Sequence, residues 1–417
     1  MAEASGAAWA AFLRELYGLA PRGIQPGLER MRAALSRLGD PQRSFDVVHI
    51  AGTNGKGSVA AMVAAGISDP GVGRFTSPHL HCLTERFVVG GEPVSRDALI
   101  ALWADVKARI ADVPLTFFET ITVLAFVLFE RRRVRIAVLE TGLGGRLDST
   151  NVSERKLVTC ITRVALDHQA WLGDDLVGIA AEKAGILAAE VPCVLAPQVP
   201  AVDAEISRIA DGLGVSISRP RVAGPSSALN VSEGSRASGP LRLRLAGQHQ
   251  RDNAGAAVAV LWALERRGVP IDLSAALLAG WPGRLEGLGA EPRVLLDIAH
   301  NPNAADALAA HLQEQAFERR VLVFGAMRDK DWARMLATLR PLFDQVILTR
   351  APMSRAEEPA RMAAAGERVE PRVTVALAAA TEWAGPAGLV VVAGSAFVVA
   401  EARAHLLGVE TDPPIAF

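Results

Sequence analysis

Short apolar stretches rich in β-branched residues alternate along this chain with longer stretches whose apolar residues recur at helical spacing. Residues 45–51 and 135–140 are of the first kind, and residues 58–67 and 120–132 are of the second. A regular succession of strands and helices predicts a mostly parallel sheet wrapped by helices. The same alternation predicts two further strands and one further helix, at residues 157–166, 191–197 and 175–186.

A second series of strands and helices begins near residue 291. The apolar run 292–299 leads into a helix for which Asn301 is the expected cap and Pro302 the first residue. Further strand and helix patterns follow it as far as the end of the sequence. This series predicts a second, smaller α/β unit of Rossmann-like type.

Two segments interrupt the alternation. Residues 215–244 gain Ser, Gly and Pro, which predicts a surface excursion that carries a hairpin. Glycine and proline are dense again at residues 280–292, where we place the seam between domains. We therefore predict one domain at residues 1–287 and a C-terminal domain at residues 288–417.

The composition narrows the classes of protein. Forty-four basic and 45 acidic residues give a net charge of −1, and the one short basic run, residues 130–135, is typical of a solvated helix end. The longest apolar runs are shorter than the ~20 residues that span a bilayer. Three scattered cysteines favour a reducing compartment, and the N-terminus lacks the basic segment of a secretory signal. We expect a cytoplasmic protein that binds neither nucleic acid nor membrane.

A glycine-rich loop lies between an apolar strand and an alanine-rich helix at residues 49–62 (HIAGTNGKGSVAAM). It does not meet the strict pattern G-x-x-x-x-G-K-[ST], because Ile50 holds the first position and Gly57 separates Lys56 from Ser58. Backbone N–H groups in such a loop can nevertheless face an anion, the helix dipole adds to them, and Lys56 is positive. We predict a P-loop ATPase-like fold here; a plain glycine-rich turn is the alternative.

Candidate reactive residues follow at neighbouring strand ends. Glu140 lies at the edge where open α/β sheets bind ligands, and its carboxylate suits Mg²⁺, although a helix cap or salt bridge fits it equally. His168 ends another strand at that edge, which favours a functional role over a structural one. Lys183 shares one helix face with Leu176 and Ile179 and so points inward. Burial would lower its pKa and let the amine react with CO₂; a snorkelling lysine is the alternative.

The second series offers polar groups at equivalent places. Asp297 and His300 lie at a strand end just before a capped helix, and residues 328–330 (RDK) follow the next strand. His249 and Asn253 lie near the start of a helix close to the seam. Any one of these is compatible with capping or surface polarity. Together they predict a cleft between two α/β domains with a phosphate loop on one wall.

In this order the motifs resemble the folylpolyglutamate synthase/dihydrofolate synthase family, a branch of the Mur-type ATP-dependent amide ligases. The resemblance covers residues 45–332 and the closing 393–403. The matching segments are AGTNGKGS, FTSPHL, TER, FFETIT, LETGLGGRLDSTN, LDHQAWLG, EKAGI, GQHQRDNA, PGRLE, LDIAHNP and MRDKDW.

This resemblance implies roles for individual residues. It implies that Ser77 and Glu140 hold one Mg²⁺, that His168 holds a second, and that a carbamylated Lys183 supports the second metal. The ATP phosphates are implied to lie on Gly52, Thr53, Asn54, Gly55, Lys56, Gly57 and Ser58.

Further roles follow from the same resemblance. Asn253 and Arg284 match nucleotide-contacting positions, and Asp297 and His300 match residues that close over ATP and help to place glutamate. The implied catalytic residues are Lys56, Lys183, Asp297 and His300. The positions that we expect to contact the pterin-bearing substrate are Thr76, Ser77, Pro78, His79, Phe118, Arg146 and Asp148.

The implied reaction joins L-glutamate to a pterin carboxylate through an acyl phosphate, with ATP and two Mg²⁺ ions. The expected substrates are dihydropteroate, tetrahydrofolate and its polyglutamates; we favour an enzyme that acts on both pterins, with a monofunctional folylpolyglutamate synthase as the alternative. Thr141 and Ile298 depart from the family pattern, as does the segment 66–74. A requirement for a monovalent cation is left open, and we expect a monomer.

Two other functions compete with this one. A Mur-type cell-wall ligase would carry a uridine-binding domain before its loop, and too little chain precedes residue 52 for one. A P-loop switch of the GTPase kind would need an N-K-x-D element, and the sequence has none.

Overall fold

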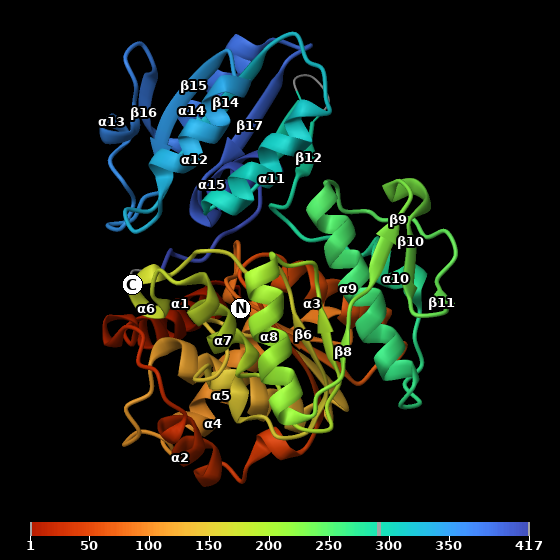
Figure 1. Cartoon of the computed structure of the whole chain (residues 1–417). Helices are drawn as coiled ribbons and strands as arrows, with labels where there is room; N and C mark the ends of the chain where they lie inside the picture. Colours follow the sequence, from red (N-terminus) through yellow and green to blue (C-terminus); the bar gives the residue numbers. More distant parts are fainter. Residues whose placement is uncertain (1, 290–292, 416–417) are drawn as a thin grey trace.

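The computed structural model describes residues 2–289 and 293–415, with the backbone alone for residues 2–5. Residues 290–292 of the predicted seam therefore lie outside the described residues, as do the outermost residues of both predicted domains. Figure 1 shows two lobes, one above the other, with a smaller green extension at one side of the lower lobe. The lower lobe holds the first sheet and is called the N-terminal lobe below; the upper one is the C-terminal lobe.

An eight-stranded sheet forms the centre of the N-terminal lobe, in the order β4-β3-β2-β5-β1-β6-β7-β8. All neighbours are parallel except β2–β3 and β3–β4, which are antiparallel. The mostly parallel sheet confirms the predicted α/β class. The strands are β1 (Asp46–Ala51), β2 (Val72–Phe75), β3 (Phe87–Val89), β4 (Glu92–Pro93), β5 (Ile136–Glu140), β6 (Lys156–Ile161), β7 (Cys193–Leu195) and β8 (Ile217–Ser218).

Helices cover both faces of this sheet because its strands are apolar on both sides. Val47 of β1 packs into one core, and its neighbours Val48 and Ile50 pack into the opposite one. The first face is covered by α1 (Ala2–Tyr17), α2 (Glu29–Arg37), α4 (Arg96–Lys107) and α5 (Phe117–Arg131). The second is covered by α3 (Lys56–Gly66), α9 (Gln248–Glu265) and α10 (Leu273–Leu278). A third cluster involves α7 (Leu176–Ala184), α8 (Pro200–Leu213) and β7, with α6 (Gln169–Leu172) beside it.

The predicted excursion at residues 215–244 carries a small sheet. Its strands are β9 (Arg221–Ala223), β10 (Asn230–Glu233) and β11 (Arg236–Ala237), and β10 and β11 form the antiparallel hairpin. In Figure 1 this sheet is part of the green extension, beside α9.

The C-terminal lobe is built on a six-stranded sheet in the order β12-β13-β17-β14-β15-β16, antiparallel only between β12 and β13. Its strands are β12 (Glu286–Leu288), β13 (Arg293–Leu296), β14 (Arg320–Phe324), β15 (Gln345–Arg350), β16 (Arg368–Arg372) and β17 (Leu389–Ala393). The helices are α11 (Pro302–Gln313), α12 (Trp332–Leu339), α13 (Pro359–Met362), α14 (Val373–Ala384) and α15 (Ala396–Leu407). The predicted division after residue 287 falls inside β12, and the position of the domain boundary stays a proposal.

Two predicted strands are clearly shorter in the structure: the run 191–197 contains only β7, and the run before it ends early in a way that shapes the site. The run 157–166 was expected to be one strand, but β6 ends at Ile161. The Gln198 side chain bonds to the backbone of Thr162 and Val164, and the Thr53 hydroxyl bonds to that of Ala165. These side chains replace a strand neighbour and turn the segment toward the glycine loop.

Candidate functional site

The glycine-rich loop connects β1 to α3 at the carboxyl edge of the first sheet. Helix α3 begins at Lys56, and Gly55 at its N-cap has a φ of 92°. The amides of Thr53 and Asn54 donate to the Arg163 carbonyl, at 2.9 and 3.1 Å, which fixes the loop on the segment after β6. The Ser58 hydroxyl is buried and has no hydrogen-bond partner among the described residues. A buried hydroxyl without a partner beside a helix N-terminus suits an anion and its metal ion.

Gly57, the residue that breaks the strict phosphate-loop pattern, lies against Trp281. A β-carbon at this position would come within 2.7 Å of the Trp281 ring. The Arg74 guanidinium lies over the same ring, 5.1 Å from its centre. The indole thus holds the segment between the lobes against the loop, and only glycine leaves room for it. Sequence reasoning missed Trp281; the dense GWPG segment was read only as a seam.

Glu140 ends β5 directly beside the loop. Its side chain is buried, its Oε1 lies 3.9 Å from Lys56 Nζ, and its Oε2 accepts a 3.0 Å hydrogen bond from the Ser77 amide. Burial raises the pKa of this carboxyl, while Lys56 and the Ser77 amide act in the opposite direction. The predicted trio of Lys56, Glu140 and Ser77 therefore meets at one point.

Lys183 is buried, only 4% exposed, as its place on the inner face of its helix predicted. Its Nζ donates to the Gly52 carbonyl at 2.8 Å, which brings it to the start of the glycine loop. Burial and the nearby charge of Lys56 lower the pKa of the Lys183 amine to about 7. A snorkelling lysine would keep its charge in water, whereas this amine is buried.

The segment 75–86 lies on the other side of Glu140 from the glycine loop and is called a wall of the site below. Thr76 is buried, the peptide bond between Ser77 and Pro78 is cis, and His79 Nδ1 accepts a 2.8 Å hydrogen bond from Arg86 Nε. Burial and the Arg86 charge hold the pKa of His79 well below its usual range, so the ring is neutral. This segment therefore carries a neutral imidazole whose orientation is fixed by Arg86.

The loop after Glu140 is shaped by Asp148. Its buried carboxylate accepts hydrogen bonds from the amides of Gly142 and Leu143, at 2.8 and 2.9 Å. Phe118 lies against Gly142, where a β-carbon would come within 2.4 Å of the ring. Arg146, by contrast, is exposed and paired with Glu182 on α7. The loop at residues 142–148 forms another wall of the site. Asp148 is buried within this wall, Phe118 packs against it, and Arg146 lies exposed at its edge.

Polar side chains of the C-terminal lobe contact Asp167 of the N-terminal lobe. His300 Nε2 lies 3.1 Å from Asp167 Oδ2, Asn301 Nδ2 donates to the same oxygen at 3.1 Å, and Lys330 pairs with Oδ1. Although burial disfavours the charged form, the His300 hydrogen bond and the Lys330 charge hold the pKa of the Asp167 carboxyl well below its usual range. Asp167 directly precedes the predicted His168 in the sequence; His168 itself is exposed.

A second contact joins the lobes at the glycine loop itself. Asn54 and Asn301 exchange hydrogen bonds of 3.2 and 3.0 Å, and Asn54 also donates to Asn303 at 2.9 Å. The predicted second-domain residue Asp297 is buried and accepts from the amides of Leu285 and Ala299. Asp297 therefore shapes the strand end from which His300 and Asn301 project.

Two predicted nucleotide-contacting residues lie beside the loop. Asn253 on α9 is buried, and its amide is so close to Gly55 that a β-carbon there would lie 2.2 Å from its oxygen. Arg284, in the segment between the lobes, is half-buried; burial raises the pKa of both Glu140 and Asp297, and the Arg284 charge opposes this rise. Both residues therefore lie on the side of the glycine loop that faces the segment between the lobes.

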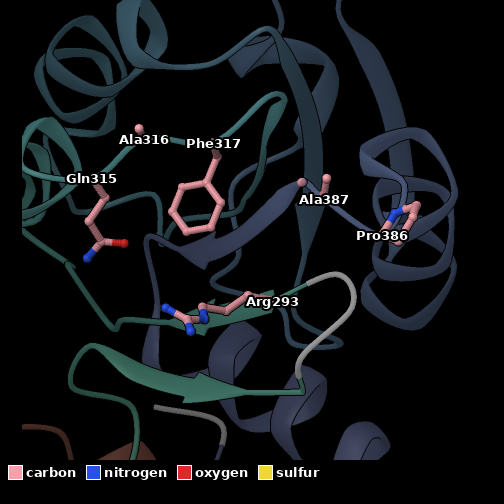
Figure 2. Close-up of a pocket in the computed structure, with 7 residues that line it drawn as sticks. Arg293, Gln315, Ala316, Phe317, Pro386 and Ala387 are labelled. Carbon is pink, nitrogen blue, oxygen red and sulfur yellow. The ribbon is translucent and has the colours of Figure 1, made fainter.

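The surface hollow in Figure 2 is separate from this site. It has a volume of about 550 Å³ and lies in the C-terminal lobe, where β13 and β17 begin. Among the described residues that line it, Arg293 is the one charged side chain, with Gln315 and Phe317 beside it. It brings together none of the predicted site residues.

The residues fit a divalent metal through few protein ligands rather than a closed cage. Within residues 2–289 and 293–415, no three His, Cys, Asp or Glu side chains converge as a metal cluster. Mg²⁺ bound together with a nucleotide needs only one or two protein ligands, because phosphates and waters complete its shell. The buried Glu140 carboxylate beside Ser77 and the unpartnered Ser58 hydroxyl meet that need.

No helix in the described part of the chain is long and apolar enough to cross a bilayer.

Comparison with known proteins identifies relatives along nearly the whole chain. Residues 283–396 match the family described as "Mur ligase, glutamate ligase domain". The dihydrofolate synthase/folylpolyglutamate synthase of Mycobacterium tuberculosis is 36% identical over 389 residues, which cover 84% of this chain and 79% of that protein. A probable bifunctional folylpolyglutamate synthase/dihydropteroate synthase of Haloferax volcanii is 37% identical over 93% of this chain. The chain spans about half the length of that relative (49%).

Solved structures agree in fold over almost the full length. The Escherichia coli FolC in complex with DHPP and ADP has a TM-score of 0.87 and 31% identity, covering 95% of this chain and 96% of that one. A bifunctional folylpolyglutamate synthase/dihydrofolate synthase with Mn, AMPPNP and L-glutamate bound has a TM-score of 0.86 and 31% identity, covering 95% and 98%.

Proposed function

The chain belongs to the dihydrofolate synthase/folylpolyglutamate synthase family, and we propose that it joins L-glutamate to a pterin carboxylate at the expense of ATP. The observation that carries this proposal is the meeting of Lys56, Glu140 and Ser77 at the glycine loop, with Lys183 at the other end of that loop. The relatives bind ADP, AMPPNP, Mn and L-glutamate, as their descriptions state, which suits this arrangement. We favour an enzyme that acts on both dihydropteroate and tetrahydrofolate.

The nucleotide is proposed to lie on the glycine loop, between Asn253 and Arg284. The loop's backbone N–H groups and the start of α3 stabilise the phosphates, and the Lys56 ammonium neutralises charge on the β- and γ-phosphates. The 3.9 Å distance between Lys56 Nζ and Glu140 is too long for a hydrogen bond, so the ammonium can turn toward a phosphate while the Ser77 amide keeps its bond to the carboxylate.

Two Mg²⁺ positions are proposed, one held by Glu140 and Ser77 and the other by His168 with Lys183. When bound, the metal ions supply charge neutralisation at the phosphates. A lysine whose pKa is about 7 is largely unprotonated above neutrality. Its free amine can add to CO₂ and release one proton, which leaves a carbamate with a terminal carboxylate. In the carbamate, the ammonium no longer donates to the Gly52 carbonyl, and its terminal carboxylate offers an anionic metal ligand beside the loop.

The chemistry proceeds in two steps. A substrate carboxylate attacks the γ-phosphate of ATP, which gives an acyl phosphate and ADP. The α-amine of L-glutamate then attacks the acyl carbon, and the tetrahedral intermediate expels phosphate and a proton. The C-terminal lobe brings Asp297 and His300 over the site, holds glutamate near the acyl carbon and keeps water away from it.

The pterin-bearing substrate is proposed to bind between the walls at residues 75–86 and 142–148. Phe118 supplies an aromatic face there, and His79 and Asp148 supply polar groups. Arg146 must release Glu182 before it can reach a substrate. The remaining proposed contacts are Thr76, Ser77 and Pro78.

Phosphate release from ATP in the presence of L-glutamate tests the proposal. We expect turnover with dihydropteroate and with tetrahydrofolate, and none with a UDP-muramyl peptide. Turnover with tetrahydrofolate alone would identify a monofunctional folylpolyglutamate synthase. Turnover with the UDP-muramyl peptide, or with neither pterin, would contradict the proposed function. The monomeric state and a cytoplasmic location stay predictions, and the monovalent-cation requirement stays open.

A further inference from the structure

The segment that follows α15 returns from the C-terminal lobe to the N-terminal lobe. Figure 1 shows this dark-blue segment running down to the lower lobe, near α1. Its residues 408–415 are called the strap below. Ile415 of the strap is only 3% exposed and belongs to the apolar core that Trp9 and Phe12 of α1 also form. The strap is therefore docked by a buried anchor.

Asp412 makes the polar contacts of the strap. Its side chain is buried; Oδ1 accepts a 2.8 Å hydrogen bond from Trp9 Nε1, and Oδ2 accepts a 2.7 Å bond from the Leu83 amide. Its own amide donates to the His81 carbonyl at 2.8 Å. Arg96 is the nearest cation, 3.8 Å away. Two of these bonds go to the backbone of the segment 75–86, which is one wall of the proposed substrate site.

The same segment is bound from the inside by Glu85. Its carboxylate accepts hydrogen bonds of 2.8 Å from the amides of Leu80, His81 and Cys82. Arg403 of α15 approaches from the C-terminal lobe, at 2.9 Å from His81 Nε2 and about equally close to Glu286. The turn at residues 80–83 is thus held by an internal carboxylate on one side and by the end of the chain on the other.

The turn at residues 80–83 lies between the residues of the segment 75–86 that contact the site. Before it come Ser77, whose amide bonds to Glu140, and His79. After it comes Arg86, whose guanidinium orients His79. A change in the position of residues 80–83 therefore moves both the Ser77 contact and the His79 ring.

From this geometry we propose that Asp412 is a positioning residue for the pterin-bearing substrate. It acts through the backbone of His81 and Leu83, and it ties the wall at residues 75–86 to the end of the C-terminal lobe. This inference rests on the proposed function for its kinetic consequence, but the docking of the strap itself does not.

The test compares Asp412→Asn with wild type. An asparagine offers one acceptor where two N–H donors converge, so either Trp9 or Leu83 loses its partner. Because a hydrogen bond to a charged group is being removed, we expect the KM for the pterin substrate to rise about tenfold, with the KM for ATP and kcat changed less than about threefold. Hydrogen exchange of the amides at residues 80–86 should become faster, while that at residues 52–58 stays unchanged.

Three further variants separate positioning from general destabilisation. Glu410→Ala removes the strap's exposed carboxylate, which contacts Arg96 at 3.3 Å, and should leave kinetics and exchange at wild-type values. Trp9→Phe removes the indole donor but keeps the Leu83 bond, and should lower stability with little change in the pterin KM. Asp412→Glu keeps both acceptors on a longer side chain and decides the question if the asparagine variant does not fold; we expect a smaller rise in KM.

Equal effects of Trp9→Phe and Asp412→Asn on the pterin KM would overturn the proposal, as would wild-type exchange at residues 80–86 in both Asp412 variants. If wild type turns over no pterin at all, the proposed function fails, and the exchange measurement still decides whether the strap positions the turn.

Discussion

At the scale of single residues, the site is defined by two lysines in different electrostatic surroundings. Lys56 lies at the N-terminus of a helix, 16% exposed at its side chain and 3.9 Å from a carboxylate. Lys183 is buried beside a carbonyl, and its pKa is lowered to about 7. The first is placed to interact with phosphates, and the second suits an amine that reacts.

Lys56→Ala should lower turnover by about two to three orders of magnitude, because a preorganised charge at the transferring phosphate is lost. Glutamate-dependent phosphate release measures it, and thermal unfolding shows that the fold is kept. Lys107→Ala is the matched control, since Lys107 lies on the surface and pairs with Glu15. A loss of less than tenfold for Lys56→Ala would mean that the phosphates bind elsewhere.

Lys183→Ala should also lose activity, but short carboxylic acids should restore part of it, because a free carboxylate can occupy the place of the carbamate. The measurement is turnover of the variant with and without added acetate or propionate. Full activity of the untreated variant would remove the carbamate from the mechanism.

Lys156 gives a pH-dependent stability that is independent of the site. Burial lowers the pKa of its amine to about 8, while the unfolded chain keeps the ordinary value of about 10.4. Between these values the unfolded state binds more protons, so the free energy of unfolding rises with pH through this window. Compared with Lys156→Met, wild type should gain stability from pH 8 to pH 10 in urea titrations. Parallel pH profiles of the two proteins would refute this.

At the scale of elements, the alternation of apolar runs predicted the two sheets because each buried strand needs only a short β-branched run and each helix a longer amphipathic one. The end of β6 could not be predicted in this way. The apolar residues up to Ala165 continue the strand pattern, but the side chains of Gln198 and Thr53 bind their backbone instead. Contacts between residues far apart in the sequence leave no periodic signal.

Because contacts between distant residues leave no periodic signal, the sequence predicted only some parts of the site. Strand ends and the glycine loop marked Glu140 and Lys56, because the topology of a parallel sheet brings them to one edge, and helical periodicity marked Lys183 as a buried lysine. Trp281 against Gly57 could not be read from spacing, since it depends on how the segment between the lobes folds back.

Gly57→Ala tests that contact. A methyl group 2.7 Å from the Trp281 ring must displace the loop or the indole, so the KM for ATP should rise about tenfold. Combining it with Trp281→Ala should recover part of the loss. Gly212→Ala, at a helix position with open space around it, is the matched control and should change nothing but stability. An unchanged KM for ATP in Gly57→Ala would show that the loop tolerates the displacement.

At the scale of the whole molecule, Asp167 joins the two lobes. Its carboxylate is 5% exposed and belongs to the N-terminal lobe, whereas its partners His300, Asn301 and Lys330 belong to the C-terminal lobe. A buried carboxylate with these partners stabilises the contact between the lobes, because separating them would leave the Lys330 ammonium without its counter-charge.

Asp167→Asn should therefore favour an open arrangement. Losing one partner of a buried ion pair costs about 2–5 kcal/mol, so we expect a larger radius of gyration in small-angle X-ray scattering and a fall in kcat. In the double variant Asp167→Asn/Lys330→Met the unpaired cation is also gone, and the lobes should close again more nearly than in the single variant. Arg355→Ala, which breaks the exposed pair with Asp329 within the C-terminal lobe, should leave the scattering unchanged. If Asp167→Asn scatters as wild type does, closure depends on the Asn54 and Asn301 contacts instead.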